Sequence, residues 1–129
     1  MKQTTLMEKY PIVELEIAKN EIKYQSVDDI IEYFKDKIDI HPVVAFIAIF
    51  DHYAHTKSLS DGMLSPNILA AKNIIFCFGK ELPKPQVMSI IPRSIGVADT
   101  GDSFIISFME APNPQAQETM MSWTKELLV

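Results

Sequence analysis

Hydrophobic and polar positions in the first third of the chain change from a strand pattern to a helix pattern. Val13, Leu15 and Ile17 are apolar and alternate with Glu14, Glu16 and Ala18. A period of two predicts a strand with one buried face. From Ser26, which we predict to be an N-cap, the apolar spacing becomes helical, until Pro42 stops the helix. The apolar positions of this predicted helix are Val27, Ile30, Ile31, Phe34 and Ile38.

Four apolar runs follow, and each predicts a strand. The first two are apolar on both faces, which is typical of strands inside a sheet. The last two are separated by Asp99-Thr100-Gly101-Asp102. This sequence favours a hairpin turn, because glycine readily adopts the positive φ that such turns require. It also contains the Asp-Thr-Gly triplet of aspartic proteases, but the turn explains the triplet better. The four runs are residues 43–50, 73–78, 94–98 and 103–109.

The remaining segments complete the predicted order of elements. Asn113 and Pro114 predict the start of a last helix, as N-cap and first-turn residue. Residues 1–9 are polar and are expected to be frayed, and residues 56–71 are expected to be irregular. The order is therefore β-α-β4-α. It predicts a single domain over residues 1–129 of the α+β class, a two-layer sandwich with a mainly antiparallel sheet and the helices packed on one face.

Composition narrows the class of protein without naming a reaction. The chain has 47% hydrophobic residues, a net charge of −5 and no cluster of Lys and Arg. We therefore expect neither nucleic acid nor an anionic membrane as a partner. The longest apolar run has eight residues, whereas a membrane-spanning helix needs about 20. The single cysteine and the lack of an apolar leader lead us to expect a cytoplasmic protein.

From Ser26 to Pro112 the pattern resembles a bacterial family, Domain of Unknown Function 302. The resemblance rests on four motifs in order: an Asp-His pair that ends a strand, an apolar strand that ends in Phe-Gly, a short segment that ends in proline, and a closing strand. It implies a TATA-binding-protein-like fold and no particular activity. The motifs are Phe50-Asp51-His52, Phe76-Cys77-Phe78-Gly79, Val87-Met88-Ser89-Ile90-Ile91-Pro92 and Phe104 to Phe108.

Asp51, His52 and His55 are the only concentrated group of chemically versatile side chains. Imidazole binds metals, and an adjacent carboxylate can orient the ring or complete a metal shell. Three interpretations remain open: Asp51 caps a turn, the group contacts a bound ligand, or it holds a metal. If the chain turns after Asp51, His52 and His55 can converge. No cofactor is indicated, and no catalytic residue is assigned.

Cys77 is a fourth candidate ligand-binding residue. Its neighbours in sequence are apolar, whereas a nucleophilic cysteine needs a nearby cation or a helix N-terminus. Buried packing is therefore the favoured interpretation. A pairing of Cys77 with His52 across adjacent strands remains an alternative.

The predicted sheet has more apolar surface than two helices on one face can cover. The second face must then be covered by residues 56–71, by a ligand or by another copy of the chain. We predict a homodimer and, as function, a non-enzymatic binding module for a small apolar ligand or a protein partner. The alternative is a metal-dependent or His-assisted enzyme centred on Asp51 and His52. The candidate interface positions are Ile47, Ile49, Ile75, Ile105 and Met109.

Overall fold

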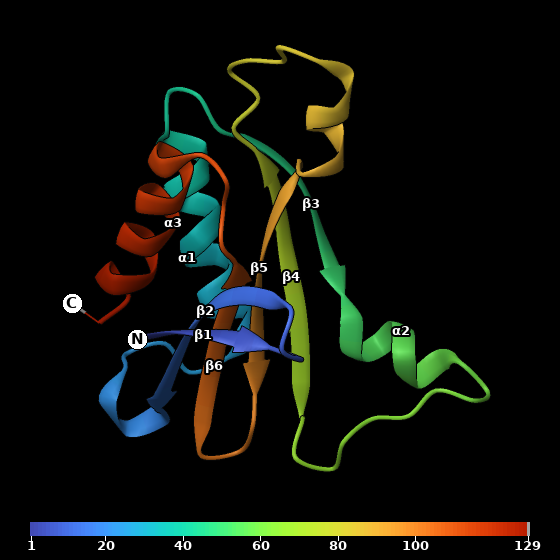
Figure 1. The fold of residues 1–129 in the computed structure, drawn as a ribbon. Helices are drawn as coiled ribbons and strands as arrows, with labels where there is room; N and C mark the ends of the chain where they lie inside the picture. Colours follow the sequence, from blue (N-terminus) through green and yellow to red (C-terminus); the bar gives the residue numbers. More distant parts are fainter. Residues whose placement is uncertain (129) are drawn as a thin grey trace.

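A computed structural model describes residues 1–128 and contains a single six-stranded sheet (Figure 1). All neighbouring strands are antiparallel, in the order β1-β2-β6-β5-β4-β3. β2 and β3 are consecutive strands at separate places in this order, so the chain must cross the sheet between them. The strands are β1 (Lys2–Leu6), β2 (Tyr10–Ala18), β3 (Ala45–Asp51), β4 (Ala70–Cys77), β5 (Arg93–Asp99) and β6 (Ser103–Met109).

Two long helices, α1 (Val27–Ile40) and α3 (Pro114–Glu126), lie side by side on one face of the sheet (Figure 1). α1 forms the crossover from β2 to β3. A third helix, α2 (His52–Ser58), follows β3 directly, and two short 3-10 helices occupy Lys19–Glu21 and Pro85–Ser89. The predicted α+β sandwich is therefore confirmed, and the structure adds one strand and one helix to the predicted order.

The core lies between this sheet face and the two long helices. Val13, Leu15 and Ile17 of β2 are opposite Phe108, Ile106 and Phe104 of β6, and all six are buried. From the helices, Phe34 and Met120 are fully buried, and Trp123 is 6% exposed. The alternation along β2 and the stripe along α1 are therefore confirmed.

Both predicted helix caps are present. The Ser26 hydroxyl accepts a hydrogen bond from the Asp29 N–H at 3.1 Å, and the Asn113 side chain accepts one from the Gln115 N–H at 2.8 Å. Each cap satisfies a backbone donor that has no partner inside the helix, which is worth about 1 kcal/mol.

Two predictions about local structure need correction. Lys2–Leu6 is a strand paired with β2, not a frayed end. All five of its residues are exposed, so its backbone pairing leaves no hydrophobic pattern in the sequence. Residues 56–58 belong to α2 and are not irregular. A seven-residue helix that buries none of its residues likewise has no apolar stripe to reveal it.

The hairpin turn between β5 and β6 is stabilised by a carboxylate. Gly101 has φ of +97°, and its N–H donates to the Asp99 carboxylate at 2.8 Å. The Lys19 ammonium lies 2.9 Å from the same carboxylate. Burial alone would raise the pKa of Asp99, but the hydrogen bond and charge of Lys19 and the Gly101 N–H outweigh it and lower this pKa below its ordinary value.

We expect Asp99→Asn to lower the free energy of unfolding by about 1–2 kcal/mol at neutral pH. Folding lowers the pKa of the Asp99 carboxyl, so the ionised carboxylate stabilises the folded chain. This stabilisation is complete above about 3.9, the pKa of the carboxyl in the unfolded chain, and it is lost as the pH falls through the lower pKa of the folded chain. Urea unfolding at neutral pH and near pH 3 measures this difference. Asp102→Asn, which removes an exposed carboxylate from the same turn, is the control. An equal loss in Asp99→Asn at both pH values would contradict the assignment.

Candidate functional site

Asp51 is placed where β3 ends and α2 begins. Its carboxylate accepts a hydrogen bond from the Ala54 N–H at 2.9 Å and therefore caps α2. The same carboxylate lies 3.9 Å from the Lys72 ammonium, which in turn is 2.6 Å from Asp28 in the first turn of α1. The hydrogen bond of the Lys72 ammonium to Asp28 and the charges of Asp28 and Asp51 outweigh its partial burial and raise the pKa of Lys72. Asp51 thus has a structural role in joining β3, α2 and β4.

The chain turns after Asp51, and this turn brings His52 and His55 together around the ring of Phe50. The Phe50 ring centre lies 5.4 Å from the imidazole of His52 and 5.5 Å from that of His55. Both histidines are exposed. Within residues 1–128, no three His, Cys, Asp or Glu side chains are arranged to share a metal ion. A transition-metal site usually takes three or four protein ligands, so the arrangement gives the metal interpretation no support.

Cys77 lies at the other end of the same strand pair. In the β3–β4 register Asp51 is opposite Lys72, whereas Cys77 is opposite Ala45. The five residue steps from Lys72 to Cys77 correspond to about 17 Å along the strand. The alternative pairing of Cys77 with His52 is therefore wrong, because antiparallel pairing places the two side chains at opposite ends of the strands.

The sheet face opposite α1 and α3 bears no charge on β4, β5 and β6, and its part over β3 to β6 is here called the open face. Beside it, β2 places Glu14 and Glu16 opposite Ser107 and Ile105. The ten residues of β4, β5 and β6 that alternate with buried core residues are either apolar or neutral and polar. The chain as a whole has 12 Lys and Arg and 17 Asp and Glu, so this neutrality distinguishes the face from the rest of the surface. The ten residues are Asn73, Ile75, Cys77, Ser94, Gly96, Ala98, Ser103, Ile105, Ser107 and Met109.

A β-bulge in β3 changes which residues reach the open face. Phe46 is opposite Phe76, but Ala48 is opposite Ile75, so Ile47 is left without a partner in the ladder. Beyond the bulge, Ile49 is opposite the buried Ile74 and Phe50 is opposite Asn73.

Directly opposite residues lie on the same face of a sheet, and a one-residue shift exchanges the two faces. Ile49 therefore lies on the helix side, which corrects its predicted place on the second face. Phe50 takes the open-face position instead and is 39% exposed. Ile75, Ile105 and Met109 are on the open face, as expected.

The segment after α2 leaves much of the open face exposed. Figure 1 shows that the chain from α2 to β4 extends away from the sheet. Its side chains Leu59, Met63 and Leu69 are 46%, 90% and 55% exposed. Met109 on the open face is 44% exposed, and Ile47 at the bulge is 50% exposed. Closure of this face by residues 56–71 is thus not what the structure shows.

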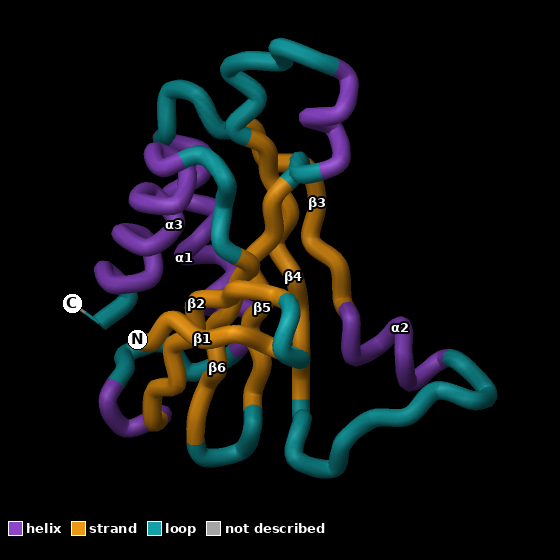
Figure 2. Tube along the Cα trace, viewed as in Figure 1, coloured by secondary structure: helices purple, strands orange, loops and turns teal. Residues whose placement is uncertain are grey.

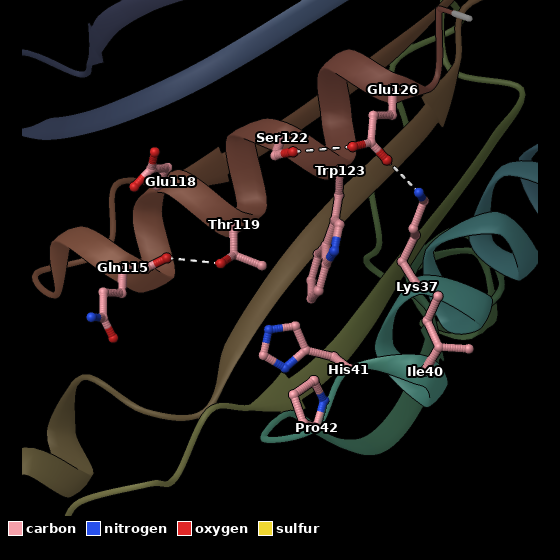
Figure 3. Close-up of a pocket in the computed structure, with 10 residues that line it drawn as sticks. All are labelled: Lys37, Ile40, His41, Pro42, Gln115, Glu118, Thr119, Ser122, Trp123 and Glu126. Carbon is pink, nitrogen blue, oxygen red and sulfur yellow. Dashed lines mark hydrogen bonds and ion pairs between the residues drawn. The ribbon is translucent and has the colours of Figure 1, made fainter.

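The structure also contains a groove between α1 and α3 that the sequence did not predict (Figure 3). Its volume is about 650 Å³, and it is open to solvent. The Lys37–Glu126 ion pair lies at one end. His41 and Trp123 are in the groove with perpendicular rings 6.1 Å apart, although 80 or so residues separate them in sequence, so no motif links them. The lining residues are Lys37, Ile40, His41, Pro42, Gln115, Glu118, Thr119, Ser122, Trp123 and Glu126.

Two backbone hydrogen bonds fix the position of the His41 ring. Its Nδ1 accepts from the Val43 N–H at 3.1 Å and from the Val44 N–H at 3.3 Å. The other ring nitrogen, Nε2, takes no part in these two bonds. Figure 3 shows Nε2 on the side of the ring that faces α3. His41 therefore closes the turn after α1 and presents the Nε2 edge of its ring to the groove.

Comparison with known proteins identifies the family of the chain. Among the described residues, no helix combines the length and the apolar character required to span a membrane. No curated protein matches the chain. A family model described as "Family of unknown function (DUF6858)" matches residues 1–129. This is not the family that the motifs resemble, so Domain of Unknown Function 302 and its TATA-binding-protein-like fold stay unconfirmed. The chain belongs to the family of unknown function DUF6858.

Proposed function

We propose that the protein is a non-enzymatic binding module that uses the open face of its sheet to bind a second copy of itself. The observation that carries this proposal is the absence of charge on the open face, which has exposed apolar side chains, in a chain with a net charge of −5. Depletion of charged residues is the compositional feature of interface centres, and exposed apolar patches of this kind mark binding surfaces.

The neutrality of the open face favours a second copy as the occupant. In a two-fold dimer the same surface packs against itself, so a patch of one charge would repel its own image. The chain has a net charge of −5, and two copies therefore repel each other over most of their surface. The neutral open face is where two copies meet with the least repulsion.

Light scattering at micromolar protein concentration tests the dimer. We expect a mass twice the 14.6 kDa of the chain. Met109→Glu and Ile105→Glu place a charge on the open face and should shift the mass to that of the monomer. Ile40→Glu is the matched control, because Ile40 is 81% exposed on the opposite layer and should leave the dimer intact.

Three results decide between the occupants of the open face. A mass of 14.6 kDa for the unmodified chain, with no bound species in native mass spectrometry, overturns the proposal. The same mass with a co-purified apolar small molecule would identify a ligand as the occupant and would also overturn the dimer. A dimer that persists in both open-face variants while their circular dichroism is unchanged would place the interface elsewhere.

An enzyme centred on Asp51 and His52 has weaker support. The Asp51 carboxylate accepts the N–H of Ala54 and is close to Lys72, so these contacts give it a structural role. A cytoplasmic location and a small apolar ligand stay predictions from the sequence.

A further inference from the structure

We infer that residues 59–69 of each copy, here called the arm, pack on the open face of the other copy. This inference rests on the proposed homodimer and adds the segment that completes its interface. The arm joins α2 to β4 and projects from the edge of the sheet next to β3 (Figures 1 and 2). Two apolar surfaces are thus exposed on one chain, and a second copy can cover both together.

The arm exposes more apolar surface than a connecting loop requires. Met63 is 90% exposed, the largest fraction among the exposed large hydrophobic residues of the described chain. Leu59 and Leu69, at the two ends of the arm, are 46% and 55% exposed. Asp61 is the only charged residue among the eleven. The arm therefore shares the near-neutral, apolar character of the open face.

The arm is held in a defined shape, which makes its exposed side chains ready to bind. At one end the Leu59 N–H donates to the Thr56 carbonyl at 3.2 Å, and at the other the Leu69 N–H donates to the Asp99 carbonyl at 2.8 Å. Gly62 lies so close to α2 that a Cβ there would be 2.0 Å from the Thr56 carbonyl oxygen. A segment ordered before binding loses less conformational entropy on association.

The size of the open face explains why the arm is needed. All but two of the ten open-face residues of β4, β5 and β6 are only partly exposed, so they offer little accessible surface. A stable interface buries about 800 Å² on each partner. The open face alone is therefore small for a stable dimer, and an apolar segment from the partner supplies the missing contact area.

Photo-crosslinking tests the position of the arm directly. A photoreactive amino acid replaces Met63, and light and ¹⁵N-labelled chains are mixed before irradiation. We expect mass spectrometry to find crosslinked peptides that join residue 63 to β4, β5 or β6, with one light and one heavy partner. The same photoreactive residue at position 40, on the opposite layer, should give no such mixed product.

The possible outcomes separate this inference from the proposed function. A dimer in which position 63 crosslinks only within its own chain, or not at all, overturns the arm inference and leaves the homodimer in place. A chain that is monomeric by light scattering overturns the homodimer and the arm with it. Mixed crosslinks to α1 or α3 would show that the arm binds another surface and would also overturn the inference.

A charge on the arm gives a second, independent measurement. We expect Met63→Glu to raise the dissociation constant of the dimer at least about tenfold, because it buries a charge at the interface. The thermal stability of the isolated chain should not change, since the side chain is 90% exposed. Met7→Glu, at a position 74% exposed in the β1–β2 turn, is the matched control. Equal dissociation constants for the two variants would contradict the inference.

Discussion

Replacing Trp123 with alanine is expected to lower the free energy of unfolding by about 3–5 kcal/mol. The indole is 6% exposed and joins α3 to the sheet and to the end of α1. Its ring centre lies 5.6 Å from that of Phe76, and it stacks on Phe78 at 6.2 Å. The truncation would leave a cavity bordered by three aromatic rings, including that of His41, and rigid rings cannot easily collapse into it.

Thermal unfolding followed by circular dichroism measures this loss. For a chain of this size the expected decrease in melting temperature is about 10–20 °C. Protein concentration must be equal in all samples, because association stabilises the folded state by mass action. Glu118→Ala, on an exposed position of the same helix, should have little effect. A decrease of less than about 3 °C for Trp123→Ala would mean that α3 does not pack as described.

The backbone carbonyl of Trp123 makes a polar contact that would remain in Trp123→Ala, because the substitution changes only the side chain. It accepts a hydrogen bond from the hydroxyl of Tyr33 on α1. Burial, together with the nearby Glu126 and Tyr24, raises the pKa of Tyr33. The hydroxyl is therefore protonated at neutral pH and able to donate. Because this bond uses the main chain, the effect of Trp123→Ala reports the packing of the indole alone.

The elements that the sequence predicts correctly are those whose pattern lies within a few neighbouring residues. β2 alternates because one of its faces is buried, and α1 has an apolar stripe because one side of it meets the sheet. Ser26 and Asn113 are recognisable as caps because a cap needs only a side-chain oxygen near the first turn. Such signals depend on neighbours in sequence, so one chain is enough to detect them.

The features that the sequence did not predict depend on contacts between distant segments. β1 is exposed on both sides, and only its pairing with β2 makes it a strand. The bulge at Ile47 is defined by how β3 pairs with β4, and no residue type in β3 predicts it. Cys77 and His52 lie at opposite ends of their strand pair because of the register between β3 and β4, which the sequence alone does not define. The groove between α1 and α3 likewise brings together residues that are distant in sequence, such as His41 and Trp123, so no sequence motif predicts it.

Phe34 and Phe50 provide the last prediction, because they are the same residue type on opposite layers of the fold. Phe34 is fully buried under the sheet, with an edge-to-face contact to Tyr33 at 5.1 Å. Phe34→Ala should lower the free energy of unfolding by about 3–5 kcal/mol, measured by urea denaturation. Phe50 is 39% exposed, so Phe50→Ala should cost about 1 kcal/mol or less in the isolated chain.

The dissociation constant of the dimer gives a second test of Phe50→Ala. Phe50 lies on the open face, so its truncation removes apolar contact area and should weaken the dimer about tenfold or more. Ile49→Ala, on the helix side of the same strand, is the matched control and should leave dimer affinity nearly unchanged. If Ile49→Ala weakened the dimer and Phe50→Ala did not, the β3 register beyond the bulge, and with it the assignment of Phe50 to the interface, would be wrong.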